Sequence, residues 1–272
     1  MLDEIGPWSE IKLEIIKKYA SAYSTILNKQ KGFYYIYIDA FAGAGVHISK
    51  ETKGFVLGSP VNALLVKPPF KEYHFIDLDR NKKETLEEII GQQDNVKIYE
   101  GDCNTILLDT VFPRVRWEDY HRALCLLDPY GLHLNWEVIK MAGKMKSIEI
   151  FLNFPIADMN RNVLRKKPAQ IDINQKERLN QYWGDESWID VAYYDVLDLF
   201  GRDREKVTND HIAEGFRKRL VETASFEYVP KPLPMRNSKG AIIYYLFFAA
   251  HKPVSEKIVH DIFKKYEKLG VK

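Results

Sequence analysis

The sequence predicts an α/β fold: a mostly parallel seven-stranded sheet with helices on both faces and a C-terminal antiparallel strand pair. Two observations predict it. Five short apolar segments alternate with helical patterns, which is the order that parallel βαβ units produce. A further apolar segment, Ala241–Ala250, follows a turn at 237–240. The five expected parallel strands are Tyr34–Ile38, Glu72–Ile76, Val96–Tyr99, Ala123–Leu127 and Ile148–Leu152.

Helical patterns fill the intervals between these strands. Residues 9–29 place apolar side chains near one face, which leaves Lys12 to Lys18 for the solvent side. Ser59-Pro60 supplies an N-cap followed by a proline at the first helical position. Asp79 is expected to cap the helix that starts at Arg80. The expected helices are 9–29, Val61–Val66, Arg80–Ile90, Asn104–Thr110, Trp136–Met145 and Asp210–Glu222.

The C-terminal part has a different pattern. Phe226–Val229 and Ala241–Ala250 are the expected antiparallel pair, joined through a proline-rich loop and a turn. Residues 156–205 match no strand–helix unit of ordinary length. We therefore expect one domain over residues 1–272 with a helical, aromatic insertion at about 156–205, whose aromatic residues form a small satellite core.

Composition limits the class of protein. The chain has 272 residues, 46% of them hydrophobic, and a net charge of +2, which indicates a globular protein and gives no general electrostatic case for nucleic acid. A basic patch on one face of the protein would not be visible in this net charge. The longest apolar run is too short for a bilayer, which needs about 20 residues. We expect a cytoplasmic protein with reduced thiols, no membrane association and no zinc site, because no C-x-x-C or H-x-x-x-H spacing occurs.

A glycine-rich turn follows the first strand. Asp39, Phe41, Ala42, Gly43 and Gly45 form the pattern Asp-x-Phe-Ala-Gly-x-Gly, which differs from the dinucleotide motif G-x-G-x-x-G. It resembles the first motif of S-adenosylmethionine-dependent methyltransferases, in which this turn holds the methionine part of the cofactor. A turn that serves only close strand–helix packing would explain the same residues.

Acidic residues also follow the second and third strands. Asp77 stands where a carboxylate would accept hydrogen bonds from the two hydroxyls of a ribose, and Leu78 would pack on the adenine face. Asp102 offers a carboxylate to the adenine amino group, and Cys103 offers a backbone N–H to a ring nitrogen. An N-cap role for Asp102 is the alternative.

The fourth and fifth strands end in polar–proline sequences. Asp128-Pro129-Tyr130 resembles the D-P-P-Y motif of amino-methyltransferases, with one proline in place of two. In that motif the carboxylate and a proline carbonyl accept hydrogen bonds from the target amino group, and the aromatic ring stacks on a flipped base. A type I turn led by Asp and Pro is the alternative.

The second polar–proline sequence is Asn153-Phe154-Pro155. Together with Asn160 and Arg161 it is expected to line the acceptor pocket, with Arg161 and the cations that follow it facing phosphates. Local turn bonds for the two asparagines, and a solvated helix face for the cations, are the alternatives.

With these residues in view, the chain resembles the three-Cys-motif partner proteins, a bacterial and archaeal family. The resemblance rests on the following segments: 37–45, Gly58-Ser59-Pro60, Gly101-Asp102, 127–131, 153–155, 159–162 and 234–237. It implies a Rossmann-like class I methyltransferase fold and a separate partner protein that carries three cysteines.

The leading hypothesis is an S-adenosylmethionine-dependent methyltransferase that N-methylates an amino group of a nucleic-acid base and releases S-adenosylhomocysteine. Asp128, Pro129 and Tyr130 would be its catalytic residues. The alternative is a catalytically silent or partner-dependent module that keeps the methyltransferase fold. The missing G-x-G-x-x-G counts against a nicotinamide-dependent oxidoreductase, and the missing G-K-[ST] excludes a P-loop hydrolase.

Overall fold

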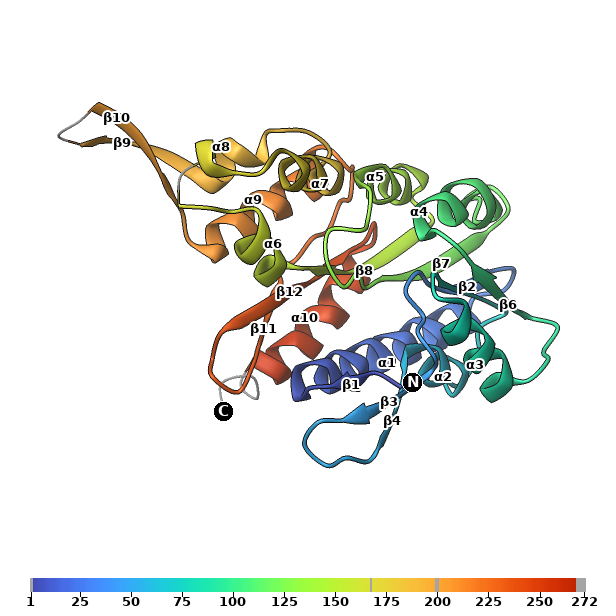
Figure 1. The fold of residues 1–272 in the computed structure, drawn as a ribbon. Coiled ribbons are helices and arrows are strands. Elements are labelled where there is room, and N and C mark those ends of the chain that lie inside the picture. The colour runs from blue at the N-terminus through green and yellow to red at the C-terminus, as the bar shows by residue number, and fades with distance from the viewer. Residues whose placement is uncertain (1, 167, 199–200, 268–272) are drawn as a thin grey trace.

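A seven-stranded sheet forms the centre of the computed structural model, which describes residues 2–166, 168–198 and 201–267 (Figure 1). The sheet strands are β2 (Tyr34–Asp39), β5 (Glu72–Asp77), β6 (Val96–Glu100), β7 (His121–Leu127), β8 (Ile148–Phe154), β11 (Leu233–Arg236) and β12 (Ile242–Ala249). Their order is β11-β12-β8-β7-β2-β5-β6. The five strands from β8 to β6 are mutually parallel, whereas β12 is antiparallel to β8 and to β11. The predicted α/β fold with a large mixed sheet is confirmed.

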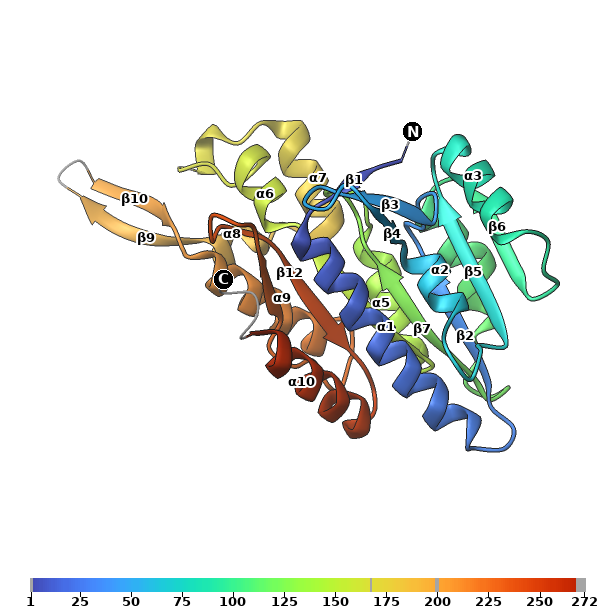
Figure 2. The same cartoon turned by 90° about the horizontal axis from the view of Figure 1, so that it is seen from below.

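Helices cover both faces of the sheet (Figures 1 and 2). One face carries α1 (Pro7–Asn28), α2 (Ser59–Leu64), α3 (Arg80–Ile90) and α10 (Pro253–Glu267). The opposite face carries α4 (Cys103–Ile106), which continues as a π-helical turn at Leu107–Val111, together with α5 (Trp136–Met145), α6 (Ile156–Asn162), α7 (Ile173–Trp183), α8 (Trp188–Ala192) and α9 (Asn209–Glu222).

Strand β2 shows how the sequence creates two cores. Successive side chains of a strand point to opposite faces of the sheet. Ile36 and Ile38 therefore enter the cluster under α5 and α9, while Tyr35 and Tyr37 enter the cluster under α1 and α10. Because both faces are covered, the strand is apolar on both sides up to Asp39, as strands of parallel sheets are.

Two expectations about local structure are wrong. The edge strand of the antiparallel pair is β11, whereas in the predicted segment Phe226–Val229 only Tyr228 forms an isolated bridge, with Ala250. The prolines of this region led us to expect a loop here. Proline is tolerated on an edge strand, however, so Pro234 does not prevent β11 from pairing with β12. The sequence predicted no strand between Ile38 and Glu72, but β3 (Val46–Ser49) and β4 (Phe55–Leu57) form a hairpin there, and β1 (Glu4–Ile5) pairs in parallel with β3.

The region 156–205 contains α6, α7 and α8 followed by a ribbon, β9 (Tyr193–Asp198) and β10 (Gly201–Lys206), that extends away from the sheet (Figure 1). Its aromatic side chains do not form a separate small core. Tyr182, Trp183 and Trp188 are buried in the same cluster as the sheet, and Tyr194 is 49% exposed on the ribbon. Among the described residues, no helix has both the length and the apolar character needed to cross a bilayer.

We expect Gly45→Ala to destabilise the fold much more than Gly240→Ala. Both glycines have a left-handed backbone, with φ of +80° and +79°, so an alanine is strained by about 1–2 kcal/mol at either position. A Cβ at Gly45 would lie 2.6 Å from Leu86 Cδ1, whereas at Gly240 no atom lies within 4 Å. Overpacking should add about 1–3 kcal/mol at Gly45. Urea unfolding of both variants measures the difference, and equal losses would contradict this packing.

Candidate active site

The polar ends of β7 and β8 meet at one point of the sheet's carboxyl edge. Asp128 directly follows β7, and Asn153 lies one residue before the end of the neighbouring β8. The Asn153 side-chain amide donates a hydrogen bond to Asp128 Oδ1 at 2.8 Å, and its nitrogen lies 3.4 Å from the Pro129 carbonyl oxygen. The two polar–proline sequences thus form one cluster, because the parallel pairing of β7 and β8 sets their ends side by side.

Lys12 of α1 completes this cluster. Its ammonium donates to Asp128 Oδ2, and its side chain is only 8% exposed. The prediction that Lys12 lies on the solvent side is wrong. Lys12 stands four residues after Trp8 and four before Ile16, so it lies on the buried stripe of the helix. That spacing was the sequence signal for a buried, paired lysine, since a lone cation on an apolar face needs a counterion.

Six predicted site residues line a single cavity of about 240 Å³: Asp128, Pro129, Tyr130, Asn153, Pro155 and Arg161. Lys12, Trp8 and Tyr244 are among the residues that complete its wall. Asn153 is 8% exposed, and its Oδ1 is buried without a hydrogen-bond partner. Buried polar atoms are nearly always hydrogen-bonded. The cavity therefore contains a free acceptor on Asn153, next to a carboxylate and a carbonyl.

Asn160 does not line this cavity. It donates to Asn209 Oδ1 at 3.0 Å and accepts from Lys206 Nζ at 2.5 Å, and so ties α6 to α9 and to the ribbon. These are long-range side-chain contacts, so they are not the local turn bonds that were the alternative for Asn160. Arg161, in contrast, is exposed at the rim of the cavity.

Asp39 shapes the glycine turn from beneath. Its side chain is fully buried, and its Oδ1 accepts from the backbone N–H of Phe41 at 3.3 Å. Burial raises the pKa of this carboxyl to about 7. Asp39 thus has no surface available to a ligand, and the structure gives it a positioning role in the turn that holds Ala42, Gly43 and Gly45.

Asp77 connects two of the turns. Its Oδ2 accepts from the N–H of Gly43 and its Oδ1 accepts from the N–H of Asp79, both at 2.8 Å. Each carboxylate oxygen can accept more than one hydrogen bond, so Asp77 can still accept from a hydroxyl group. Leu78 beside it is 76% exposed, which leaves an apolar side chain uncovered at this edge. Asp79 caps α3, as predicted.

Asp102 has the structural role that was its alternative. It caps α4 by accepting from the N–H of Thr105 at 3.2 Å, and it also accepts from the side chain of Asn104. Its carboxylate remains exposed. Cys103 is buried, and burial raises the pKa of its thiol to about 12, so only its backbone is suited to a ligand contact.

His47 was missed by the sequence reasoning because no motif contains it. It lies in β3, and a Cβ on Gly43 would be 3.8 Å from its Cε1, which sets the imidazole against the glycine turn. Its Nδ1 is buried without a partner, and burial lowers its pKa. The buried Nδ1, the uncovered Leu78 and the carboxylate of Asp77 fit the carboxylate, adenine and ribose of S-adenosylmethionine.

The N-terminal segment crosses the same edge. Asp3 accepts from Lys82 Nζ of α3 at 2.7 Å and from the Tyr130 hydroxyl at 3.3 Å. Lys82 Nζ also lies 5.2 Å from the centre of the Tyr130 ring. These contacts link the helix after β5 to the loop after β7. The N-terminal segment therefore lies between the turn at Asp77 and the cavity at Asp128.

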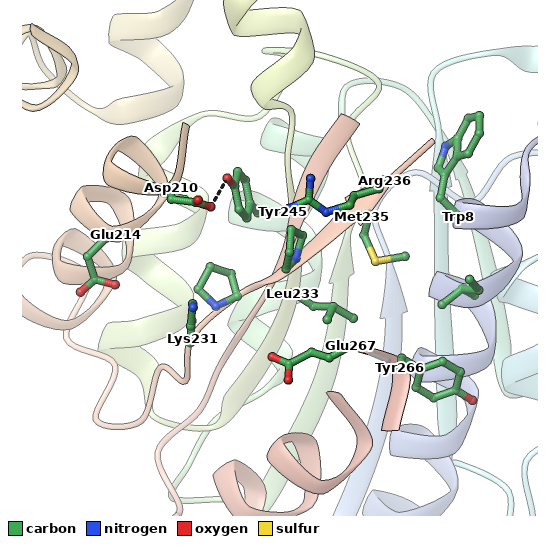
Figure 3. A pocket seen from close by; sticks show the side chains of 14 residues that line it. Trp8, Asp210, Glu214, Lys231, Leu233, Met235, Arg236, Tyr245, Tyr266 and Glu267 are labelled. Carbon is green, nitrogen blue, oxygen red and sulfur yellow. Dashed lines mark hydrogen bonds between the residues drawn. The ribbon is translucent and has the colours of Figure 1, made fainter. Parts of the chain in front are cut away.

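A larger cavity, of about 470 Å³, lies beside the edge strand β11 (Figure 3). Its wall combines the aliphatic Leu233 and Met235 with the charged Lys231 and Glu214, and Tyr245 donates to Asp210 at 2.6 Å. It contains none of the predicted site residues. Ligands of open α/β sheets bind outside the carboxyl ends of the parallel strands, so the smaller cavity at Asp128 is the candidate active site.

No protein-family model matches the sequence, and a search of curated proteins finds no match. Solved structures with a similar fold include a Legionella pneumophila protein of the DUF519 family, at 12% identity and a TM-score of 0.48, covering 95% of this chain and 93% of that one. A candidate S-adenosylmethionine-dependent methyltransferase of Listeria monocytogenes shares 11% identity at a TM-score of 0.40, over 86% and 98%. A candidate methyltransferase of Thermobifida fusca shares 14% at 0.42, over 88% and 80%. At these scores the likeness does not assign an activity.

We expect Asp39→Asn to remove a pH dependence of stability. The folded-state pKa of Asp39 lies near 7, above the value of 3.8 for a free aspartate, so between these pH values the folded chain binds more protons than the unfolded chain. This contribution to stability is complete at low pH and is lost as the pH rises through 7. Relative to Asp39→Asn, the wild type should lose about 4 kcal/mol between pH 4 and pH 8. Urea unfolding at both pH values measures this, and parallel pH profiles would contradict it.

Proposed function

We propose that the protein is an S-adenosylmethionine-dependent methyltransferase that N-methylates an amino group of a nucleic-acid base. The observation that carries the proposal is the convergence of Asp128, the Pro129 carbonyl and the unpartnered Asn153 Oδ1 on one cavity. Three acceptors at one place suit a group with N–H donors. The cavity lies at the carboxyl edge of the sheet, in the same row of turns as Gly43 and Asp77.

The cofactor residues follow from the fit described above. S-adenosylmethionine, when bound, supplies an electrophilic methyl group on a sulfonium sulfur. Asp77 would accept from the ribose hydroxyls and Leu78 would pack on the adenine ring, while the exposed carboxylate of Asp102 and the backbone of Cys103 would read the edge of that ring. His47 and the N–H groups of the glycine turn would face the methionine carboxylate.

The acceptor residues would orient the amino group. Hydrogen bonds to Asp128 and to the Pro129 carbonyl, with Asn153 Oδ1 as a further acceptor, would fix its two hydrogens and leave its lone pair directed at the methyl group. Asp128 would take the proton that the nitrogen loses after transfer. Tyr130 is 70% exposed and presents a ring on which a flipped base can stack, and Arg161 at the rim suits a phosphate.

One observation supports the second candidate function, a catalytically silent or partner-dependent module. Both oxygens of Asp128 are already engaged, one by Lys12 and one by Asn153. In this reading the ion pair holds the loop after β7 closed until a partner protein binds, and the resemblance to the three-Cys-motif partner family suggests that partner. A protein that co-purifies with the chain, without methyl transfer to DNA, RNA or protein pools, would favour this candidate.

We expect Asp128→Ala to abolish methyl transfer while binding of S-adenosylhomocysteine changes less than about threefold. Loss of a group that orients and deprotonates the acceptor should lower the rate by about 100-fold or more. Transfer is measured with radiolabelled S-adenosylmethionine and pooled DNA and RNA, and Asp94→Ala, an exposed acid far from the cavity, is the matched control.

Asp128→Ala alone leaves the buried Lys12 without a counterion, which costs about 3–5 kcal/mol. The double variant Lys12→Met/Asp128→Ala removes this cost, and its melting temperature shows whether the fold has recovered. We expect the stabilised double variant to remain inactive. If it regains methyl transfer, Asp128 serves only to neutralise Lys12, and the proposed role is wrong.

A further inference from the structure

A second cavity lies at the opposite, amino edge of the sheet. It has a volume of about 330 Å³ and lies between α1, α10 and the first residues of β7 and β8, where Arg122 and Glu149 stand. It shares no lining residue with the cavity at Asp128. The proposed methyl transfer makes no use of it. Its size is within the range of small-molecule sites, about 300–1,000 Å³.

The wall of this cavity is aromatic. Tyr19 and Tyr23 of α1 contribute rings from one side, and Phe33 and Trp117 contribute rings from the loops before β2 and β7. Trp117 is 37% exposed, which is unusual for so large an apolar side chain. Flat rings on several sides favour a planar apolar body.

Three cationic side chains line the same cavity: Arg122, Lys146 and Lys252. The Arg122 guanidinium stacks on Trp117, with its carbon 3.5 Å from the ring centre, and its Nη1 donates only to the carbonyls of Trp117 and His121. Lys252 Nζ lies 5.2 Å from the same ring. Within the described part of the chain, none of the three forms an ion pair with a carboxylate. Partial burial lowers the pKa of Arg122.

Glu149 does not neutralise these cations. It is the single acid that lines the cavity, and its two oxygens accept from Tyr19 at 2.5 Å and from Ser255 at 2.6 Å. Burial raises its pKa, which favours the uncharged form. His251, 4% exposed in the same wall, has its Nδ1 3.8 Å from Glu227 Oε1. The cavity thus combines an aromatic wall with three cations that its one lining acid does not neutralise.

We propose that this cavity binds a small organic anion with a planar apolar body and one carboxylate, sulfonate or phosphate group. The body would lie among the four aromatic rings. Its charge would face Arg122, Lys146 and Lys252, none of which forms an ion pair with a carboxylate of the described residues. This site is independent of the proposed function and does not require a nucleic-acid substrate.

Two matched dyes test both parts of the proposal on the full chain. The fluorescent probe 8-anilinonaphthalene-1-sulfonate carries a planar naphthalene ring and one anionic group, and N-phenyl-1-naphthylamine is the same molecule without the sulfonate. We expect the anionic dye to bind at one site, about tenfold more tightly than the neutral dye, which corresponds to one well-placed charge contact. Equal affinity of the two dyes would overturn the proposal.

Charge variants locate the site. Lys146→Glu/Lys252→Glu alters only exposed side chains, and we expect it to weaken binding of the anionic dye by about fivefold or more while binding of the neutral dye stays within about twofold. Arg122→Gln should do the same if its melting temperature is retained. Arg80→Gln, an exposed arginine on α3, is the matched control and should change neither dye. Unchanged binding of the anionic dye in the lysine double variant would overturn the site.

Discussion

The buried ion pair between Lys12 and Asp128 is the interaction on which the architecture of the candidate active site depends. Burying a lysine side chain to 8% exposure is costly without a counterion, and Asp128 at the end of β7 supplies that counterion. The pair therefore fixes the position of α1 along the sheet. Tyr19 strengthens this placement by packing against Phe151 and Phe248, with ring centres 5.3 and 4.7 Å away. One helix thus contributes Trp8 and Lys12 to the acceptor cavity and Tyr19 to the cavity at the opposite edge.

The turns at the carboxyl edge are bonded to one another as well as to their own strands. Asp77 accepts from the N–H of Gly43 and, through its carbonyl, from the N–H of Gly101 at 3.0 Å. Asn104 donates to the carbonyl of His133 and accepts from the N–H of Asn135, which joins α4 to the loop after β7. Such cross-links position functional groups before a ligand arrives and so reduce the entropic cost of binding. The parallel sheet brings together the turns that follow β2, β5, β6 and β7, and these hydrogen bonds fix the positions of the turns relative to one another.

The sequence was sufficient to predict those features of the fold that depend on a local residue pattern. The parallel strands and the helix Arg80–Ile90 follow from periodicity and caps, and the acceptor cluster follows from the rule that parallel strands end at one edge. Features set by tertiary contact were not predicted. Lys12 was assigned to solvent because its counterion is 116 residues away in the sequence, and Asp39 was assigned to the ligand because its complete burial is a property of the packed sheet.

Calorimetric titration of the folded chain with S-adenosylhomocysteine tests the central claim most directly, because it asks whether the carboxyl edge binds the cofactor before any substrate is known. We expect saturable heat at one site per chain, a loss of affinity of about tenfold or more in Asp77→Ala, and no heat with NAD. A folded wild-type chain that gives no heat with S-adenosylhomocysteine would contradict the claim and leave the partner-dependent module as the better account.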